Sequence, residues 1–346
     1  MSELKGTRIV VRIRAWAMAT AALVIVAGTT GQAQVVLSAE QFPSPSEADR
    51  LLLEDAIDVH AHLDPDSFGP HSAQAARALD SIDMARRAKA AGMRGFVIKH
   101  HYDETAGIAY LTSKEVPGVE AFGQLGLNLT AGGLNPAAVH HFAEIKGGHG
   151  RIVAMPTWDS EHNIRHSRNP DKPFVPVSRD GELLPETRAI IDAVAAARVR
   201  DSGARLALST GHLSPAEALM VIRYAKEQGV DQIIVTHAMG HPINMTIDQM
   251  KEAAALGAFI EFASAFVIGS RAEFTVQQYY DAIRAIGTDH VILSSDSGQM
   301  NRPMPDDAIA YVAGQLRTKG LTDAELRQIM IDNPARLLGL TQSSVR

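Results

Sequence analysis

The feature that most constrains the fold is a regular alternation of short apolar runs with amphipathic helical stretches, which begins near residue 55. Eight runs have the composition of strands that are buried on both faces. They lie at 56–63, 95–101, 120–128, 152–158, 205–212, 232–239, 258–264 and 290–297. Eight strands that alternate with helices in a chain of 346 residues predict an α/β fold, the (β/α)8 or TIM barrel, as a single domain.

Signals between the runs agree with this interpretation. Ser214 and Glu217 have the spacing of a capping box, Asn135-Pro136 of a cap followed by a first helical turn, and Gly229 of a helix stop. A doubly wound dinucleotide-binding sheet is disfavoured, because no G-x-G-x-x-G loop follows a strand. A long polar segment with four prolines, 159–188, follows the fourth run. At the catalytic face of a barrel, such a loop is a candidate lid.

The first residues differ from the rest. Four basic residues precede an apolar stretch at 15–28, and small residues follow it. This order is typical of a signal peptide over 1–33, cleaved after Ala33. A lead-in segment at 34–54 and the barrel at 55–346 would remain, and we expect a periplasmic or secreted protein. A retained membrane anchor is the alternative, which the short apolar run disfavours.

Composition excludes several kinds of site and partner. The chain has no cysteine, so any metal must be bound by nitrogen and oxygen atoms, and neither a disulfide nor a cysteine nucleophile is possible. The formal charge of −6, without a basic cluster, makes nucleic acid an unexpected partner. We expect a small-molecule substrate and no stable membrane span after signal cleavage, and the composition is compatible with a homo-oligomer.

Residues of the type that binds metals lie where the apolar runs end. They are His60, His62, Lys99, His212, His237 and Asp296. His60 and His62 are two residues apart on a strand, so their side chains should leave by the same face. The carboxyl ends of barrel strands meet at one face, which predicts that these residues converge on a metal site. The alternative is a set of core histidines that are hydrogen-bonded to their neighbours.

The ordered motifs resemble those of the amidohydrolase superfamily of metal-dependent hydrolases. They are "DVHAHL" (58–63), "STGH" (209–212), "VTHAMG" (235–240), "SSDSG" (294–298) and "NPARLLGL" (333–340). The resemblance covers about residues 54–340 and is greatest to the compact, phosphotriesterase-like type. It implies two divalent metal ions, with zinc as the default and manganese or iron as alternatives. It also implies that His60, His62 and Asp296 bind one ion and that His212 and His237 bind the other.

The sequence departs from this family in one respect. Many binuclear members bridge their metals with a carboxylated lysine or a glutamate on strand four, but "IVAMPTW" (152–158) contains neither. We expect Lys99, at the end of strand two, to be N-carboxylated and to bridge the ions in its place. The alternative is a lysine that forms a salt bridge with Asp58 or Asp296. Asp159 and Glu161 are the reserve candidates for a bridge.

The expected reaction is hydrolysis of an amide, a lactone or other ester, or a phosphoester by a metal-bridged hydroxide. Asp296 would be the catalytic proton acceptor. His101 and His241 are expected to contact the substrate, although a surface role for His241 is equally compatible. Glu261 would be either an acid behind the ligands or a solvated residue that faces outward. A metal-dependent decarboxylase and a catalytically silent binding module are the alternative functions.

Overall fold

The computed structural model describes residues 24–26, 34–36, 42–67, 76–269, 272–300 and 302–341. The chain divides into two compact units, Met1–Gln41 and Phe42–Arg346. In the first unit, β1 (Val24–Val26) pairs antiparallel with β2 (Gln34–Val36). The other residues of the predicted signal peptide lie outside the described residues, and so does the predicted cleavage point. A helix with the length and apolarity to cross a membrane does not occur within the described ranges.

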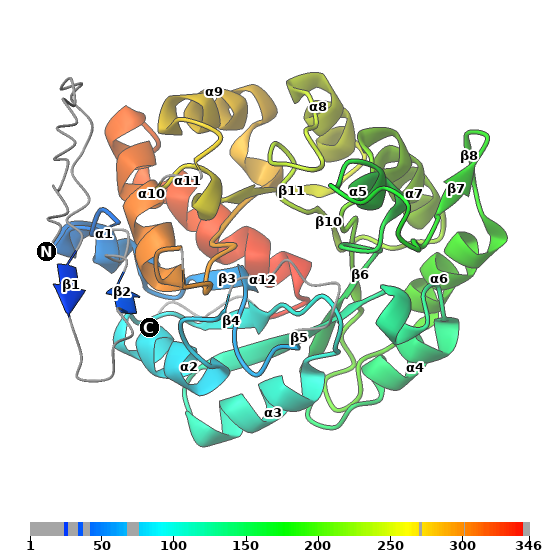
Figure 1. Cartoon of the computed structure of the whole chain (residues 1–346), viewed down its shortest axis with the longest axis horizontal. Helices are drawn as coiled ribbons and strands as arrows, with labels where there is room; N and C mark the ends of the chain where they lie inside the picture. Colours follow the sequence, from blue (N-terminus) through cyan, green and yellow to red (C-terminus); the bar gives the residue numbers. More distant parts are fainter. Residues whose placement is uncertain are drawn as a thin grey trace, which may run out of the picture. The chain divides into compact units, whose positions relative to one another are not determined.

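The second unit is built on eight parallel strands that follow one another in chain order (Figure 1). They are β3 (Ile57–Ala61), β4 (Gly95–Ile98), β5 (Glu120–Gly126), β6 (Gly150–Ala154), β9 (Ala207–Ser209), β10 (Ile233–Val235), β11 (Phe259–Ala263) and β12 (Val291–Ser294). The first and last strands meet just beyond their ends, where the His62 amide donates to the Ser297 carbonyl at 2.8 Å. The predicted (β/α)8 barrel and all eight predicted runs are therefore confirmed.

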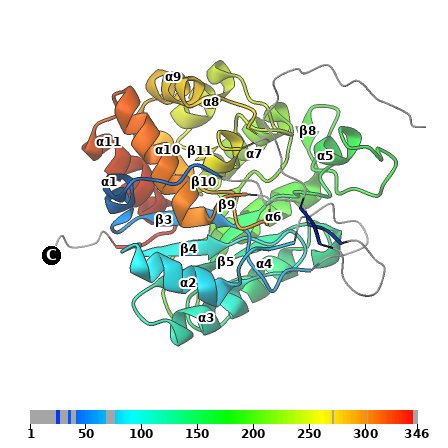
Figure 2. The same cartoon turned by 60° about the vertical axis from the view of Figure 1, so that its left-hand side comes forward.

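One long helix follows each strand, and the helices surround the strands (Figure 2). These helices are α2 (Ser81–Ala90), α3 (Ala106–Glu115), α4 (Pro136–Ala143), α6 (Pro185–Ala196), α7 (Pro215–Glu227), α8 (Ile247–Ala255), α9 (Val276–Ile286) and α10 (Pro305–Lys319). The predicted caps are confirmed: Ser214 and Glu217 form a capping box, and the Asn135 side chain accepts from the Ala137 amide. Gly229, two residues after α7, has a φ of 79°.

The barrel interior is apolar at the end where the strands begin. All eight strands contribute to one buried cluster, which includes Phe122 and Ile292. Leu337 and Leu338 belong to the same cluster, so α12 (Asn333–Leu337), within the "NPARLLGL" motif, closes this end. A larger apolar cluster fills the space between strands and helices. The opposite end of the barrel is therefore the one that can hold polar chemistry.

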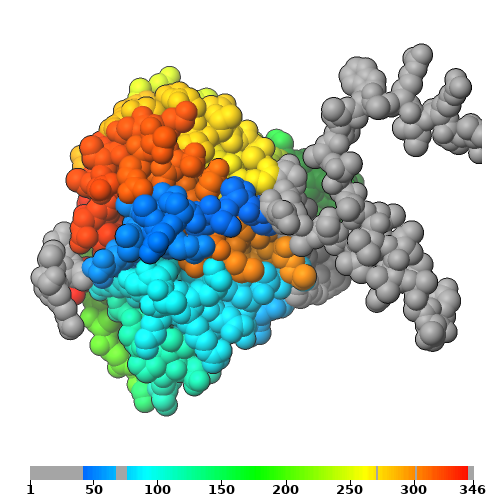
Figure 3. All heavy atoms as spheres, turned by 90° about the vertical axis from the view of Figure 1, so that its left-hand side faces the viewer, coloured from blue at the N-terminus to red at the C-terminus, as the bar shows by residue number. Residues whose placement is uncertain are grey.

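The residues before the first barrel strand pack on the outside of the barrel. The short α1 (Glu47–Arg50) and the 3-10 turn Leu51–Leu53 lie against α10, as the blue segment beside the orange one in Figure 3 shows. Ion pairs fix this contact: Arg50 pairs with Asp307, and Arg317 Nη2 lies 3.3 Å from Asp49 Oδ1. The end of the predicted lead-in thus adds to the helical layer on the outside of the barrel.

Candidate metal centre

His60 lies near the end of β3, and the other predicted ligands lie shortly beyond the ends of their strands. The strands are shorter than the predicted runs, because β4 ends at Ile98, β9 at Ser209 and β12 at Ser294. Lys99, His212 and Asp296 therefore belong to the loops that leave the barrel. Loop backbone can adopt conformations that a strand cannot, and Asp296 has a positive φ of 47°.

His60, His62 and Asp296 form a compact group of possible metal ligands. His60 Nε2 lies 3.2 Å from His62 Nε2, and Asp296 Oδ1 lies 3.2 Å from the first and 3.1 Å from the second. The register of β3 against β4 shifts between Asp58 and Ala61, which is the part of the strand that contains His60. The prediction that the two histidines point the same way is confirmed.

His212 and His237 form a second pair, from the loops that follow β9 and β10. Their Nε2 atoms are 3.3 Å apart, and the His60 and His237 rings stack with centroids 5.9 Å apart. Gly211 makes this position possible: its φ is 58°, and a Cβ atom there would lie 2.2 Å from the Met155 carbonyl oxygen. Two unprotonated nitrogens that face each other repel, and a cation between them removes that repulsion.

Glu261 on β11 lies behind the ligands, so the outward-facing alternative is wrong. Its Oε1 atom is 2.9 Å from His60 Nδ1, and its Oε2 atom accepts from the His237 amide at 2.7 Å. Burial opposes ionisation, but His60, Lys99 and His237 outweigh it and lower the pKa of Glu261 to about 2. A carboxylate on Nδ1 holds the proton there and leaves Nε2 of His60 free to bind a metal.

Lys99 is buried beside His60. Its Nζ atom lies 3.2 Å from His60 Nδ1, on the ring nitrogen that also faces Glu261, and Lys99 does not line the pocket. Burial lowers the pKa of Lys99, against the opposing effect of Glu261, Asp296 and Asp58. Asp58 instead accepts from the amides of His60 and Ser295, both at 3.0 Å. The bridging role of Lys99 stays a prediction.

Four buried histidines of the pocket, His62, His101, His212 and His237, are held in the neutral form that binds metals. Burial lowers the pKa of His62 and of His237 to about 4, although Asp296 opposes the shift. The pKa values of His101 and His212 are lowered well below the ordinary range for the same reason. The pKa of Asp296 lies well below its usual range, because His60 and His62 outweigh the effect of burial. The centre thus combines neutral imidazoles with an ionised carboxylate.

We expect the metal-free protein to lose stability in acid. Between pH 6.5, the ordinary pKa of histidine, and about 4, the unfolded chain binds protons at His62 and His237 that the folded chain does not. The free energy of unfolding should therefore fall as the pH falls through this window. Thermal melts of chelated wild type and His62→Gln measure it, and the variant should show the weaker pH dependence. His141→Gln, an exposed histidine on α4, is the control, and identical slopes for all three proteins would contradict the prediction.

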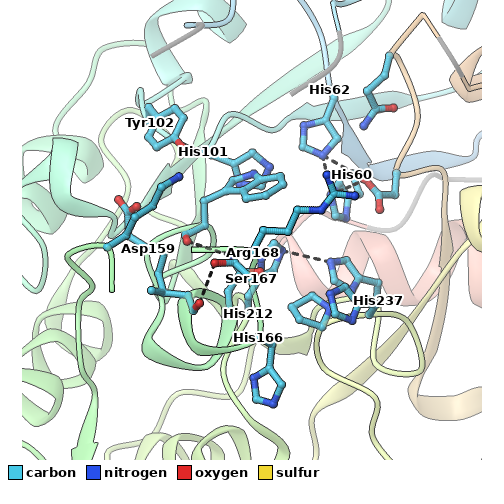
Figure 4. A pocket seen from close by; sticks show the side chains of 18 of the residues that line it. His60, His62, His101, Tyr102, Asp159, His166, Ser167, Arg168, His212 and His237 are labelled. Atoms are coloured by element: carbon cyan, nitrogen blue, oxygen red, sulfur yellow. Dashed lines mark hydrogen bonds and ion pairs between the residues drawn. The ribbon is translucent and has the colours of Figure 1, made fainter. Parts of the chain in front are cut away.

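A cavity of about 650 Å³ contains the cluster (Figure 4). Both predicted substrate contacts line it: His101, which stacks on His62 with centroids 5.2 Å apart, and His241, which is exposed. Asp159 also lines the cavity, and its Oδ2 accepts from the Leu129 amide at 2.9 Å. Glu161 does not line it and lies 3.5 Å from Arg165. Of the two reserve bridges, only Asp159 faces the site.

The long segment after β6 forms one wall of this cavity. It contains α5 (Glu161–Arg165) and the hairpin of β7 (Ser178–Arg179) and β8 (Glu182–Leu183). Ser160 Oγ donates to the His212 carbonyl at 2.8 Å, and His162 Nε2 lies 2.8 Å from the Pro242 carbonyl oxygen. The segment is therefore attached to the loops that carry the histidines. Its predicted role as a lid stays a prediction.

Trp158, Arg168 and Lys172 are among the pocket residues that sequence reasoning missed. Trp158 contacts the rings of His101 and His212, with centroids 5.2 Å and 6.2 Å apart, and Arg168 and Lys172 line the same wall. Trp158 ends the fourth predicted run, just as the predicted metal ligands lie at the ends of other runs, and this signal was available. The two basic residues lie in an irregular loop, where no periodicity shows which way a side chain points.

The comparisons with known proteins agree with this architecture. A family model described as "Family of unknown function (DUF6282)" matches residues 55–261. The chain belongs to this family. The DUF6282 match includes His60, His62, Lys99, His212 and His237, whereas Asp296 lies beyond it. No curated protein matches the chain.

Solved structures resemble this DUF6282 chain in fold. An organophosphorus hydrolase from Deinococcus radiodurans has 18% identity and a TM-score of 0.53, over 87% of this chain and 98% of that one. A lactonase from Listeria monocytogenes has 16% identity and a TM-score of 0.54, over 84% and 97%. An amidohydrolase from Pseudomonas aeruginosa has 14% identity and a TM-score of 0.53, over 85% and 98%. Identities this low show a shared fold and no more. For the fold, they confirm the expected likeness to compact, phosphotriesterase-like barrels.

Proposed function

We propose that this chain is an exported metal-dependent hydrolase that cleaves an amide, a lactone or other ester, or a phosphoester. The observation that carries the proposal is the convergence of His60, His62 and Asp296 within 3.2 Å of one another, beside the His212–His237 pair. The fold shared with an organophosphorus hydrolase, a lactonase and an amidohydrolase supports it. Export rests on the signal-peptide pattern of residues 1–33.

The donor set fits two divalent ions. His60, His62 and Asp296 would hold one ion, His212 and His237 the other, and a carboxylated Lys99 would contact both. When bound, such ions lower the pKa of water and polarise the carbonyl or phosphoryl oxygen of a substrate. Imidazole-rich sites without thiolates suit zinc, and manganese or iron(II) also accept nitrogen and oxygen ligands. The lowered pKa of Lys99 favours the neutral amine, which is the form that reacts with carbon dioxide.

The residues of the chain supply proton transfer and orientation. Asp296 is ionised and faces the pocket, so it can accept a proton from the attacking water and return it to the leaving group. Glu261 fixes the orientation of His60 through Nδ1. His101, held by Thr157 Oγ1 at 2.9 Å, and His241 line the space in which the substrate would lie.

Metal analysis tests the proposal directly. We expect the protein, purified without chelators, to contain close to two divalent ions per chain, because the ligand-type residues converge in one pocket. Elemental analysis gives the content, and a panel of esters, lactones, amides and phosphoesters gives the activity before and after chelation. Hydrolysis that is lost on chelation and regained with zinc or manganese supports the proposal. Protein without bound metal, and without activity after metal is added, contradicts it and favours the binding module.

A further inference from the structure

The pocket has an excess of positive charge that the metal chemistry does not use. Among the residues that the structure describes, four cationic side chains line it, Arg77, Arg168, Lys172 and Arg302, against two carboxylates, Asp159 and Asp296. Asp296 is engaged with His60 and His62, and Asp159 accepts from the Leu129 amide. Within the described residues, the ion pairs of Asp296 are with these two histidines and with no lysine or arginine.

Two of the cations have structural partners. Arg77 pairs with Asp66, and both side chains are almost fully buried. Arg302 donates to the Ala265 carbonyl at 2.5 Å, and its guanidinium lies 6.0 Å from the centre of the Phe266 ring. These contacts account for how the two arginines are placed in the fold.

Arg168 and Lys172 differ from them. Within the described part of the chain, no side-chain hydrogen bond or ion pair is recorded for either residue. Figure 4 shows the Arg168 side chain extending across the pocket toward His60 and His62. Arg165, three residues before it, turns away and lies 4.6 Å from the centre of the Phe174 ring. Arg165 thus packs against its own segment, whereas Arg168 faces the metal centre.

The turn that presents Arg168 is ordered by local hydrogen bonds. Ser167 Oγ donates to the Ile164 carbonyl at 2.8 Å, and the Asn169 amide donates to Ser167 Oγ at 3.2 Å. The Lys172 amide donates to the Asn169 carbonyl at 3.4 Å. The fold therefore fixes the backbone that carries these two cationic side chains on one wall of the pocket. Because this backbone is already ordered, ligand binding costs less conformational entropy than it would in a mobile loop.

We propose that the substrate carries an oxyanionic group, a carboxylate or a phosphate, in addition to its scissile bond, and that Arg168 and Lys172 bind this group. The inference rests on the proposed function, because it names the substrate class for the same pocket. Two divalent ions would add positive charge beside the two cations, and an anionic substrate offsets that repulsion and is steered to the site. Trp158, Tyr102 and Phe266 supply apolar surface for the remainder of a compact molecule.

Binding measurements test the inference without turnover. Calorimetry on the full chain with its metals uses glutarate, inorganic phosphate and glutaramide, which is the neutral diamide of glutarate. We expect at least one anion to bind more tightly than glutaramide, and Arg168→Gln/Lys172→Gln to weaken that anion about tenfold or more. Arg179→Gln, an exposed residue on β7 outside the pocket, should leave the affinity unchanged. Preference for glutarate or for phosphate identifies which oxyanion the pocket accepts.

Paired substrates separate this inference from the hydrolase proposal. 4-Nitrophenyl glutarate carries a free carboxylate, and 4-nitrophenyl valerate is its neutral counterpart. The double variant should lose kcat/KM for the first ester and retain it for the second. If neither ester is cleaved but the variant loses anion binding, the hydrolysis of such esters is contradicted, whereas the inference about anion binding is supported. Anions that bind no better than glutaramide, or that bind equally to wild type and double variant, overturn the inference.

Discussion

Asp296→Asn should lose nearly all turnover while it keeps most of its metal. The amide oxygen can still coordinate a cation beside His60 and His62, but the amide cannot accept a proton at neutral pH. Loss of a general base typically costs about 10²–10⁴ in rate, and we expect kcat to fall by that amount. Elemental analysis and steady-state kinetics on the same preparation give the two quantities together.

Asp159→Asn is the matched control for this variant. Asp159 is the second carboxylate among the described residues that line the pocket. Its Oδ2 accepts a hydrogen bond from the Leu129 amide, and an asparagine oxygen at this position can accept the same bond. We expect its kcat to remain near that of wild type. If Asp296→Asn kept most of its kcat, another residue would take the proton, and His241, which also lines the pocket, would be the next to test.

Lys99→Ala should lose at least one metal ion per chain. A carboxylated Lys99 would contribute one oxygen to each ion, so its removal opens both coordination spheres. Lys99→Glu should be the mildest replacement, because a carboxylate can also lie between two cations. We further expect small carboxylic acids or bicarbonate to restore part of the metal content of Lys99→Ala by filling the space. Elemental analysis of the variants, with and without acetate, measures both effects.

The position of Lys99 beside His60 Nδ1 allows the two roles of this lysine to be distinguished by experiment. An ordinary ammonium at this position would interact with His60 and the nearby carboxylates without binding an ion, and Lys99→Ala would then retain both ions. A carbonyl signal from protein exchanged with ¹³C-bicarbonate, absent from Lys99→Ala, would identify the carbamate independently of activity. Full metal content in Lys99→Ala, without that signal, would remove Lys99 from the ligand set and leave Asp159 as the bridge candidate that faces the pocket.

The barrel and most of the site could be predicted because they depend on local pattern. Eight apolar runs separated by helix signals leave few other topologies, and the carboxyl ends of parallel strands must meet at one face. His60 lies near the end of its strand, and His62, His212, His237 and Asp296 lie shortly beyond theirs, so the fold class alone brings them together. The capping residues Ser214 and Asn135 were predictable for the same reason, since a cap acts only on the adjacent turn.

Only the tertiary structure decided the parts that depend on distant segments. Strand alternation left two directions for Glu261, and its contact with His60, 201 residues earlier, selected the interior. Arg168 and Lys172 belong to a loop without periodicity, so their direction depends on how α5 docks against the loops after β9 and β10. A side chain on a strand inherits its direction from the backbone repeat, whereas one on an irregular loop obtains it from contacts made after the chain has folded.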